Sequence, residues 1–260
     1  MNETATPLLA AGEPEPVTVH NADGPSPLLL VVDHAGNRIP RALGRLGIGE
    51  AEAERHIAWD IGIAGVARTL ADALGALLIL QNYSRLVIDC NRPPGSPASI
   101  PEISELTPIP GNVNLSEAAK AARAREIFWP YHERIEAEIE RRRQAGRPTA
   151  FVALHSFTPV FKGEARAWHA ALLYNRDPRL ARRLLALLDE QPGLIVGDNQ
   201  PYHVSDTTDF TIPMHGERRG LPHALIEIRQ DLIADETGQR QWAERLARVL
   251  PRAYAELAVA

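Results

Sequence analysis

The stretch ALIEIRQDL at 224–232 is decisive for the fold, because it combines an apolar strand with two charged side chains. Glu227 and Arg229 lie two residues apart, and alternation along a strand points both toward the same face. A charged pair on a buried strand is costly unless it is paired, solvated in a cleft or used chemically. Taken alone, this strand fits either a structural ion pair at a sheet edge or an active site.

Three other strand-like runs also end in polar, chemically useful residues. These runs are LLLVVDHAGN (28–37), RLVIDCNR (85–92) and FVALHSFTP (151–159). The residues at their ends are Asp33, His34 and Asn37; Asp89, Asn91 and Arg92; and His155 and Ser156. Ligands bind at the carboxyl ends of strands in open α/β sheets, so four such endings predict one shared crevice.

The remaining pattern alternates between strands and helices. A helix is expected over 50–74, where His56 and Asp60 lie four residues apart on one face. The runs 76–80 and 86–89 predict a tight strand pair, and the proline-rich stretch 92–114 predicts a long binding loop. The further expected elements are helices over 116–143, 178–190 and 239–257, strands over 150–154, 169–175 and 193–197, and a lid loop over 197–223. This order predicts a three-layer α/β/α sandwich with a mixed, mostly parallel sheet.

Length and composition limit the class of protein. The chain has 260 residues, of which 45% are hydrophobic and 23% charged, and this predicts a single domain over 16–260 that follows a mobile segment over 1–15. The net charge of −5 gives no electrostatic basis for binding nucleic acid. No apolar run approaches the roughly 20 residues of a membrane helix, and the N-terminus lacks a basic leader, so we expect a cytoplasmic protein without a membrane partner.

The histidines at two strand ends indicate a metal site. His34 and His155 are typical zinc ligands, and catalytic zinc needs a third protein ligand. The predicted helix offers Asp60 or His56 for this position, or for a hydrogen bond to a ligand; an exposed i,i+4 pair would explain them equally well. The single cysteine, Cys90, excludes a disulfide within the chain and a cysteine-based zinc site.

A carboxylate beside such a metal can act as general base for water, and Glu227 fits this role. Arg92, Arg229 and Asn91 could bind a substrate carboxylate or polarise a carbonyl, which implies a small anionic substrate. Arg85 is a further candidate for binding the substrate. Tyr202 and His215 of the predicted lid loop are also candidate substrate contacts. Ser156 is a weaker candidate for catalysis, because the chain has no G-x-S-x-G motif.

Seven segments together carry a family resemblance. They are DHAGNRIP (33–40), HIAWDIG (56–62), SRLVIDCNRP (84–93), YHERI (131–135), ALHSFTP (153–159), GDNQPY (197–202) and GLPHALIEIRQDLI (220–233). In this order they resemble the N-formylglutamate amidohydrolase family over about residues 25–255. More distantly, the order is similar to that of the zinc carboxypeptidases.

The resemblance implies a zinc-exopeptidase, phosphorylase/hydrolase-like type of fold and hydrolysis of an amide. It implies metal-binding roles for His34 and His155 and the role of base for Glu227. It also implies carboxylate-binding roles for Asn91 and Arg92. The pattern departs at Asn37, where the carboxypeptidases have a glutamate ligand.

The sequence therefore predicts a Zn²⁺-dependent or other divalent-metal-dependent hydrolase of an N-acyl amino acid, such as N-formyl-L-glutamate. One alternative is a carboxypeptidase or amidase acting on short peptides or cell-wall fragments. Another is a non-catalytic protein that binds an acidic metabolite and whose metal site is degraded at Asn37.

Overall fold

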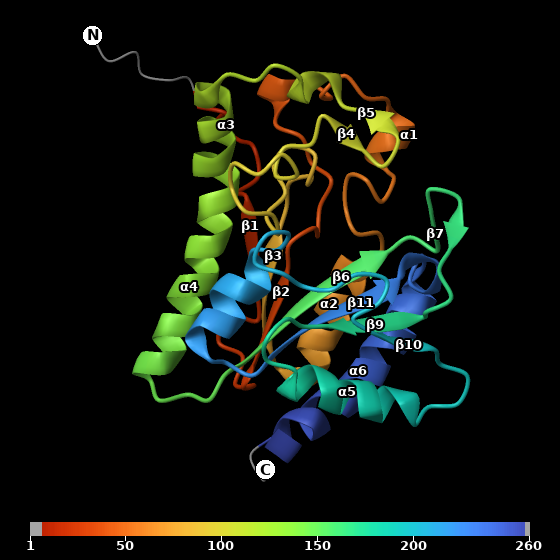
Figure 1. The fold of residues 1–260 in the computed structure, drawn as a ribbon. Helices are drawn as coiled ribbons and strands as arrows, with labels where there is room; N and C mark the ends of the chain where they lie inside the picture. The colour runs from red at the N-terminus through yellow and green to blue at the C-terminus, as the bar shows by residue number, and fades with distance from the viewer. Residues whose placement is uncertain (1–6, 258–260) are drawn as a thin grey trace.

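Seven strands form a mixed sheet through the centre of the computed structural model, which describes residues 7–257 (Figure 1). The spatial order is β1-β3-β2-β6-β11-β9-β10. The strands are β1 (Val17–His20), β2 (Leu28–Val32), β3 (Leu77–Gln81), β6 (Ala150–Phe157), β9 (Ala170–Leu173), β10 (Val196–Asp198) and β11 (His223–Arg229). Because β3, β2, β6 and β11 run parallel, their carboxyl ends lie at one edge of the sheet.

Helices cover both faces of the sheet, which confirms the predicted α/β/α layering (Figure 1). One face carries α2 (Ile63–Leu74), α5 (Arg179–Asp189) and α6 (Glu236–Leu257). The other carries one long helical segment made of α3 (Glu117–Arg123), the π-helical η3 (Ala124–Phe128) and α4 (Trp129–Gln144). The smaller elements are α1 (Glu50–Ala53), the hairpins β4–β5 (Ile103–Ser104, Thr107–Pro108) and β7–β8 (Val160–Phe161, Glu164–Ala165), and the short helical turns η1 (Arg41–Leu43), η2 (Pro110–Asn112), η4 (Ile212–Gly216), η5 (Glu217–Arg219) and η6 (Gln230–Leu232).

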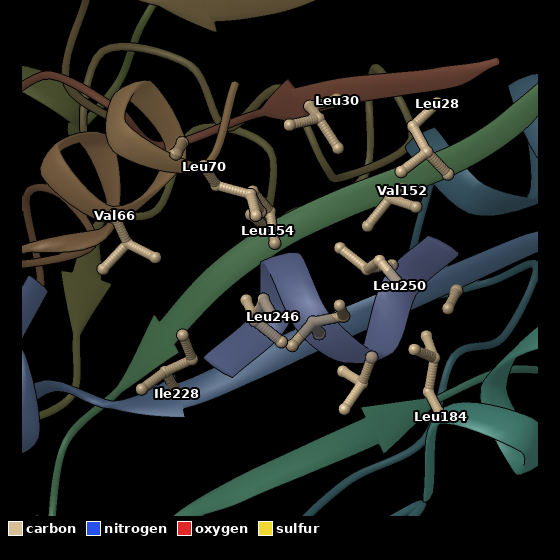
Figure 2. Close-up of a cluster of buried hydrophobic side chains, with 14 of the residues drawn as sticks. Leu28, Leu30, Val66, Leu70, Val152, Leu154, Leu184, Ile228, Leu246 and Leu250 are labelled. Atoms are coloured by element: carbon tan, nitrogen blue, oxygen red, sulfur yellow. The ribbon is translucent and has the colours of Figure 1, made fainter. Parts of the chain in front are cut away.

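The central strands are buried on both sides and divide their side chains between two cores. On β2, Leu28 and Leu30 face α2, whereas Leu29 and Val31 face the long helical segment. Figure 2 shows the first core, in which side chains from the sheet meet Leu70 of α2 and neighbours on α5 and α6. Burial on both faces explains why the strands are continuous apolar runs.

The long helix predicted over 116–143 is confirmed, and it begins where its capping residue indicates. Ser116 accepts a hydrogen bond from the backbone N–H of Ala119 at 3.2 Å, as an N-cap residue does. The strands predicted near 150, 170 and 196 and the helices predicted over 178–190 and 239–257 are also present.

The predicted strand pair over 76–80 and 86–89 is wrong in its second member. β3 pairs instead with β1, which has no counterpart among the expected strands. Residues 84–89 form turns, with Val87 N donating to Ser84 O at 2.9 Å and Asp89 N donating to Ser99 O at 2.8 Å. These bonds fold the segment over the carboxyl ends of the strands.

The single helix predicted over 50–74 is also wrong. α1 ends at Ala53 and α2 begins at Ile63, and between them backbone bonds reach other segments. Asp60 N donates to His34 O at 3.0 Å, and Arg85 N donates to Ala58 O at 3.1 Å. His56 and Asp60 therefore do not share a helical face.

The start of the described chain packs against the domain. Leu8 is buried, Leu9 N donates to Glu126 Oε2 at 2.9 Å, and Tyr83 Oη donates to Pro14 O at 2.7 Å. Residues 1–6 of the expected mobile segment lie outside the described residues, so its mobility stays a prediction. Within residues 7–257, none of the helices combines the length and apolarity needed to span a bilayer.

Replacing Gly62 by alanine should destabilise the protein strongly, because Gly62 ends the break that delivers Asp60. Its φ of +79° is left-handed, and an added Cβ would overlap the carbonyl oxygen of Ile233. We expect a loss of more than about 3 kcal/mol in the free energy of unfolding, measured by urea denaturation. Gly220→Ala is the matched control, because Gly220 is also left-handed, with a φ of +64°, but has open space around it, so the substitution should cost only about 1 kcal/mol. Equal losses would contradict this account.

Candidate active site

Three strand ends place the central groups of the site side by side. β6 lies between β2 and β11, and His155 of β6 is in register with Glu227 of β11. His34 follows β2 on the other side of β6, and its ring centroid lies 5.0 Å from that of His155. The predicted convergence of strand endings is therefore present for these three residues.

His34, His155 and Asp60 form a buried group that could hold a metal ion. One potential ligand atom from each residue lies within 4.8 Å of the others. Asp60 Oδ2 lies 3.0 Å from His155 Nδ1 and 3.4 Å from His34 Nδ1. Two imidazole nitrogens and one carboxylate oxygen are a donor set found at catalytic zinc sites, so the residues present fit a metal of this kind.

Two further aspartates orient the histidine rings. Asp89 Oδ1 lies 2.7 Å from His34 Nε2, and Asp33 Oδ2 lies 2.9 Å from His155 Nε2. Carboxylates typically fix metal-binding histidines in this way, leaving the other ring nitrogen for the metal. The sequence predicts no specific role for these aspartates beyond their position at the ends of strand-like runs, with Asp33 directly before His34.

The charges of this group depend strongly on one another. Burial opposes ionisation of Asp60, but His34 and His155 outweigh this effect and hold the pKa of Asp60 below its usual range. Burial likewise lowers the pKa of His155, yet hydrogen bonds to Asp33 and Asp60 raise that pKa well above its ordinary value. The site is therefore a strongly anionic environment that attracts a cation.

Glu227 is a buried carboxylate with one free oxygen. Its Oε1 accepts a hydrogen bond from Tyr202 Oη at 2.8 Å, whereas its buried Oε2 has no partner among the described residues. Burial raises the pKa of Glu227 to about 7, and the charge of Asp60 adds to this effect against opposing contributions from His155, Tyr202 and Arg85. A carboxylate with this pKa can accept and return a proton near neutral pH.

The group opens into a cleft with two connected cavities. A cavity of about 570 Å³ is lined by His34, His155 and Glu227, and a neighbouring cavity of about 640 Å³ extends toward the β4–β5 and β7–β8 hairpins. Both cavities are lined by Asp60, Arg85, Arg92, Ser156 and Tyr202. Together they offer enough space for a small molecule bound across the site.

Arg85, Arg92 and Asn91 lie at this cleft, but each already has bonds within the protein. Arg85 donates to Asp89 Oδ2 at 2.6 and 2.9 Å. Arg92 Nη1 donates to the carbonyl oxygen of Thr208 at 2.6 Å.

Asn91 is engaged with the lid loop. Its Oδ1 accepts backbone bonds from Phe210 and Thr211 at 3.1 and 3.0 Å, and its Nδ2 donates to Asp209 at 3.2 Å. These bonds fasten the lid loop to the segment after Asp89. Tyr202, from the same loop, lines both cavities, as expected for a substrate contact.

Three other predicted site residues lie outside the metal-ligand group. His56 lines the second cavity, where its Nε2 lies 3.5 Å from Glu105. His215 is buried behind the sheet end, with its Nε2 2.9 Å from His132 Nδ1. Arg229 turns away from the cavities and donates to Asp231 at 2.8 Å. Asn37 also lies apart, donating to the carbonyl oxygen of Ala53 at 3.1 Å.

Comparison with known proteins points to one family. A model of the N-formylglutamate amidohydrolase family matches residues 26–234. The chain is also similar to the crystal structure of a gene product from Agrobacterium tumefaciens, with 39% sequence identity and a TM-score of 0.93 over 96% of this chain and 99% of that chain. A search of curated proteins finds no match.

A more distant likeness concerns the fold alone. The crystal structure of N-formylglutamate amidohydrolase from Ralstonia eutropha JMP134 is 20% identical, with a TM-score of 0.68 over 95% of this chain and 100% of that chain. The mixed sheet with helices on both faces is therefore shared at low sequence identity.

Removing the charge of Asp33 should weaken metal binding without unfolding the site. Asp33→Asn can still accept a hydrogen bond from His155 and donate one to Thr211, but it no longer places a negative charge behind the ring that makes the opposite ring nitrogen a more basic ligand. We expect affinity for added Zn²⁺ to fall about 10- to 100-fold, measured by competition with a chromogenic chelator. Asp72→Asn removes a similar carboxylate from an exposed pair with His20 and should have no effect. Unchanged affinity in Asp33→Asn would show that Asp33 does not support a ligand.

Proposed function

Because the chain belongs to the N-formylglutamate amidohydrolase family, we propose that it hydrolyses the amide bond of an N-acyl amino acid, with N-formyl-L-glutamate as the first substrate to test. The observation that carries this proposal is the free, buried Oε2 of Glu227 beside the His34, Asp60 and His155 group. A base next to a metal-binding group is the arrangement that amide hydrolysis by water requires.

Glu227 is the proposed base. Its Oε2 takes a proton from the attacking water while a C–O bond forms at the acyl carbon. The C–N bond then breaks, and Glu227 returns the proton to the departing amine, which yields a carboxylic acid and an amino acid. Tyr202 holds the other oxygen of Glu227, which leaves Oε2 as the oxygen without a hydrogen-bond partner among the described residues.

The proposed metal is zinc, held by His34, Asp60 and His155. Bound there, zinc would supply a Lewis acid that acidifies water and polarises the acyl carbonyl. Asp33 and Asp89 fix the two rings, and Arg92 lines both cavities at a position where its guanidinium can meet a substrate carboxylate.

The second cavity favours one alternative function. It adds about 640 Å³ beyond the metal-binding group, so the cleft could admit a substrate longer than one amino acid. An amidase acting on short peptides would use the same base and metal-binding residues. A screen of N-formyl and N-acetyl amino acids against short N-acyl peptides separates the two, since each function predicts turnover of a different set.

Metal removal should abolish and metal addition should restore turnover. Elemental analysis of the purified protein is expected to show about one zinc per chain, because one three-ligand group is present among residues 7–257. Dialysis against a chelator should remove both metal and activity, and stoichiometric Zn²⁺ should restore them. Turnover that persists without metal would exclude the metal role, and absence of both bound zinc and rescue would favour a non-catalytic binding protein.

Glu227→Gln should reduce turnover while leaving substrate binding largely intact. The amide keeps the bond with Tyr202 and the volume of the side chain but cannot accept the proton of water, so we expect kcat to fall about 10³-fold. Steady-state kinetics give kcat, and calorimetric titration with N-formyl-L-glutamate gives the affinity. Glu102→Gln is the control, because Glu102 also lines the cleft but lies outside the metal-binding group, and its kcat should stay near wild type. Near-normal turnover in Glu227→Gln would eliminate Glu227 as the base.

A further inference from the structure

Arg166 places a cation in the second cavity, at the base of the β7–β8 hairpin. Its guanidinium carbon lies 4.8 Å from the ring centroid of Phe161, 5.6 Å from that of Tyr202 and 5.7 Å from that of Phe157. Among residues 7–257, no carboxylate oxygen lies within 4.0 Å of its nitrogens. Aromatic rings shield this guanidinium, but its charge has no anionic partner in the protein.

The other two arginines of the cavity differ from Arg166 in this respect. Arg85 is neutralised by Asp89 through two hydrogen bonds, and its Nη1 also lies 3.5 Å from Asp60 of the metal-binding group. Arg92 Nη1 is bonded to Thr208 O and lies 3.5 Å from Asp209. Arg166 Nη1 donates to the carbonyl oxygen of Thr158 at 3.5 Å, but among the described residues Arg166 is the arginine lining this cavity that has no carboxylate oxygen within 4.0 Å.

The backbone that carries Arg166 is fixed from two directions. Arg166 N donates to Pro159 O at 2.8 Å, which closes the β7–β8 hairpin. Arg229 Nη1 donates to the carbonyl oxygens of Arg166 and Trp168 at 3.2 and 3.4 Å. Arg229 stands two residues after Glu227 on β11. The same strand therefore carries the proposed base and, through Arg229, binds the backbone of Arg166.

Tyr202 links this cation to the proposed reaction centre. Its ring lies beside the Arg166 guanidinium, and its hydroxyl group donates to Glu227. An anion bound by Arg166 would thus lie close to Tyr202, whose hydroxyl group contacts the proposed base. An N-acyl amino acid fits this arrangement, because its carboxylate lies only a few bonds away from its scissile amide.

We propose that Arg166 binds a carboxylate of the substrate and makes the cleft selective for anionic N-acyl amino acids. The inference rests on the proposed function and adds a specificity residue to it. The planar guanidinium suits a carboxylate, and the surrounding rings limit competition from water.

Kinetics of Arg166→Gln with matched substrates test the proposal. With N-formyl-L-glutamate, KM should rise about 10- to 100-fold while kcat changes little, because a charge-assisted contact distant from the reacting bond is lost. Two half-neutral substrates identify the bound group: N-formyl-L-glutamine lacks the side-chain charge, and the α-amide of N-formyl-L-glutamate lacks the other. One of these two substrates lacks the carboxylate that Arg166 binds. For that substrate, KM should already be high in the wild-type protein and should not change further in Arg166→Gln.

Lys162→Gln is the matched control. Lys162 is a cation of the same hairpin but does not line the cleft, so its loss should leave KM for all three substrates unchanged. Arg166→Lys keeps the charge without the planar fork and should give an intermediate KM. Equal KM changes for Arg166→Gln and Lys162→Gln would overturn the proposal, as would the same KM change for all three substrates in Arg166→Gln.

A binding measurement separates failure of this inference from failure of the proposed function. Glutarate is the probe, titrated calorimetrically into the zinc-loaded wild-type protein, Arg166→Gln and Lys162→Gln. Weaker binding only in Arg166→Gln supports the anion site even if no N-acyl amino acid is hydrolysed. Hydrolysis of N-formyl-L-glutamate with unchanged glutarate affinity and KM in Arg166→Gln would retain the function and overturn the role of Arg166.

Discussion

Asp60 Oδ2 accepts the backbone N–H of Ser156 at 3.1 Å and lies within 3.4 Å of a ring nitrogen of both His34 and His155. One oxygen atom therefore joins the segment after β2, the break between α1 and α2, and the end of β6. The backbone bond from Asp60 N to His34 O ties two of these segments a second time. Because the strands are buried on both faces, their carboxyl ends have little freedom to move, and the short, bonded loops place the side chains within ligand distance.

Burying this many charges requires compensation. Asp33, Asp60 and Asp89 are all buried, and Arg85 supplies one permanent positive charge against them. Hydrogen bonds that His155 donates to Asp33 and Asp60 raise the pKa of His155 against the opposing effect of burial, so in the absence of a cation the ring is stabilised in its protonated form. A divalent ion needs neutral imidazoles as ligands and would replace these protons, so metal affinity and pH must be linked at this site. The aspartates that orient the rings are therefore also the source of the competition between proton and metal.

Whether the sequence predicts a residue of this site depends on the kind of element that carries the residue. His34, His155 and Glu227 stand at or near the ends of apolar runs, so strand periodicity and parallel pairing suffice to predict that they converge. Asp60 comes from a segment with helical periodicity that is not helical, because the backbone N–H of Asp60 and the carbonyl oxygen of Ala58 bond to other segments and Gly62 adopts a left-handed conformation. The strand predicted over 86–89 is absent for a related reason, since turns within this segment replace strand pairing. Local pattern cannot reveal long-range backbone bonds of this kind, and these bonds decide both cases.

Glu227 and Arg229 of ALIEIRQDL lie in different environments, because the neighbouring strand β9 ends its pairing with β11 between them. Ala224, Ile226 and Ile228 face the core beneath α6, and Leu225 and Glu227 face the opposite side. β9 accompanies β11 as far as Ile228, beyond which Arg229 N bonds to His169 O and its guanidinium reaches the carbonyl oxygens of Arg166 and Trp168. Glu227 is thus enclosed by strands on both sides and remains poorly solvated, whereas Arg229 emerges over a loop that it can bind. The strand β11 consequently holds the buried carboxylate of Glu227 and, through Arg229, also fixes the loop that carries Arg166, so it sets the relative positions of the proposed base and the proposed anion-binding guanidinium.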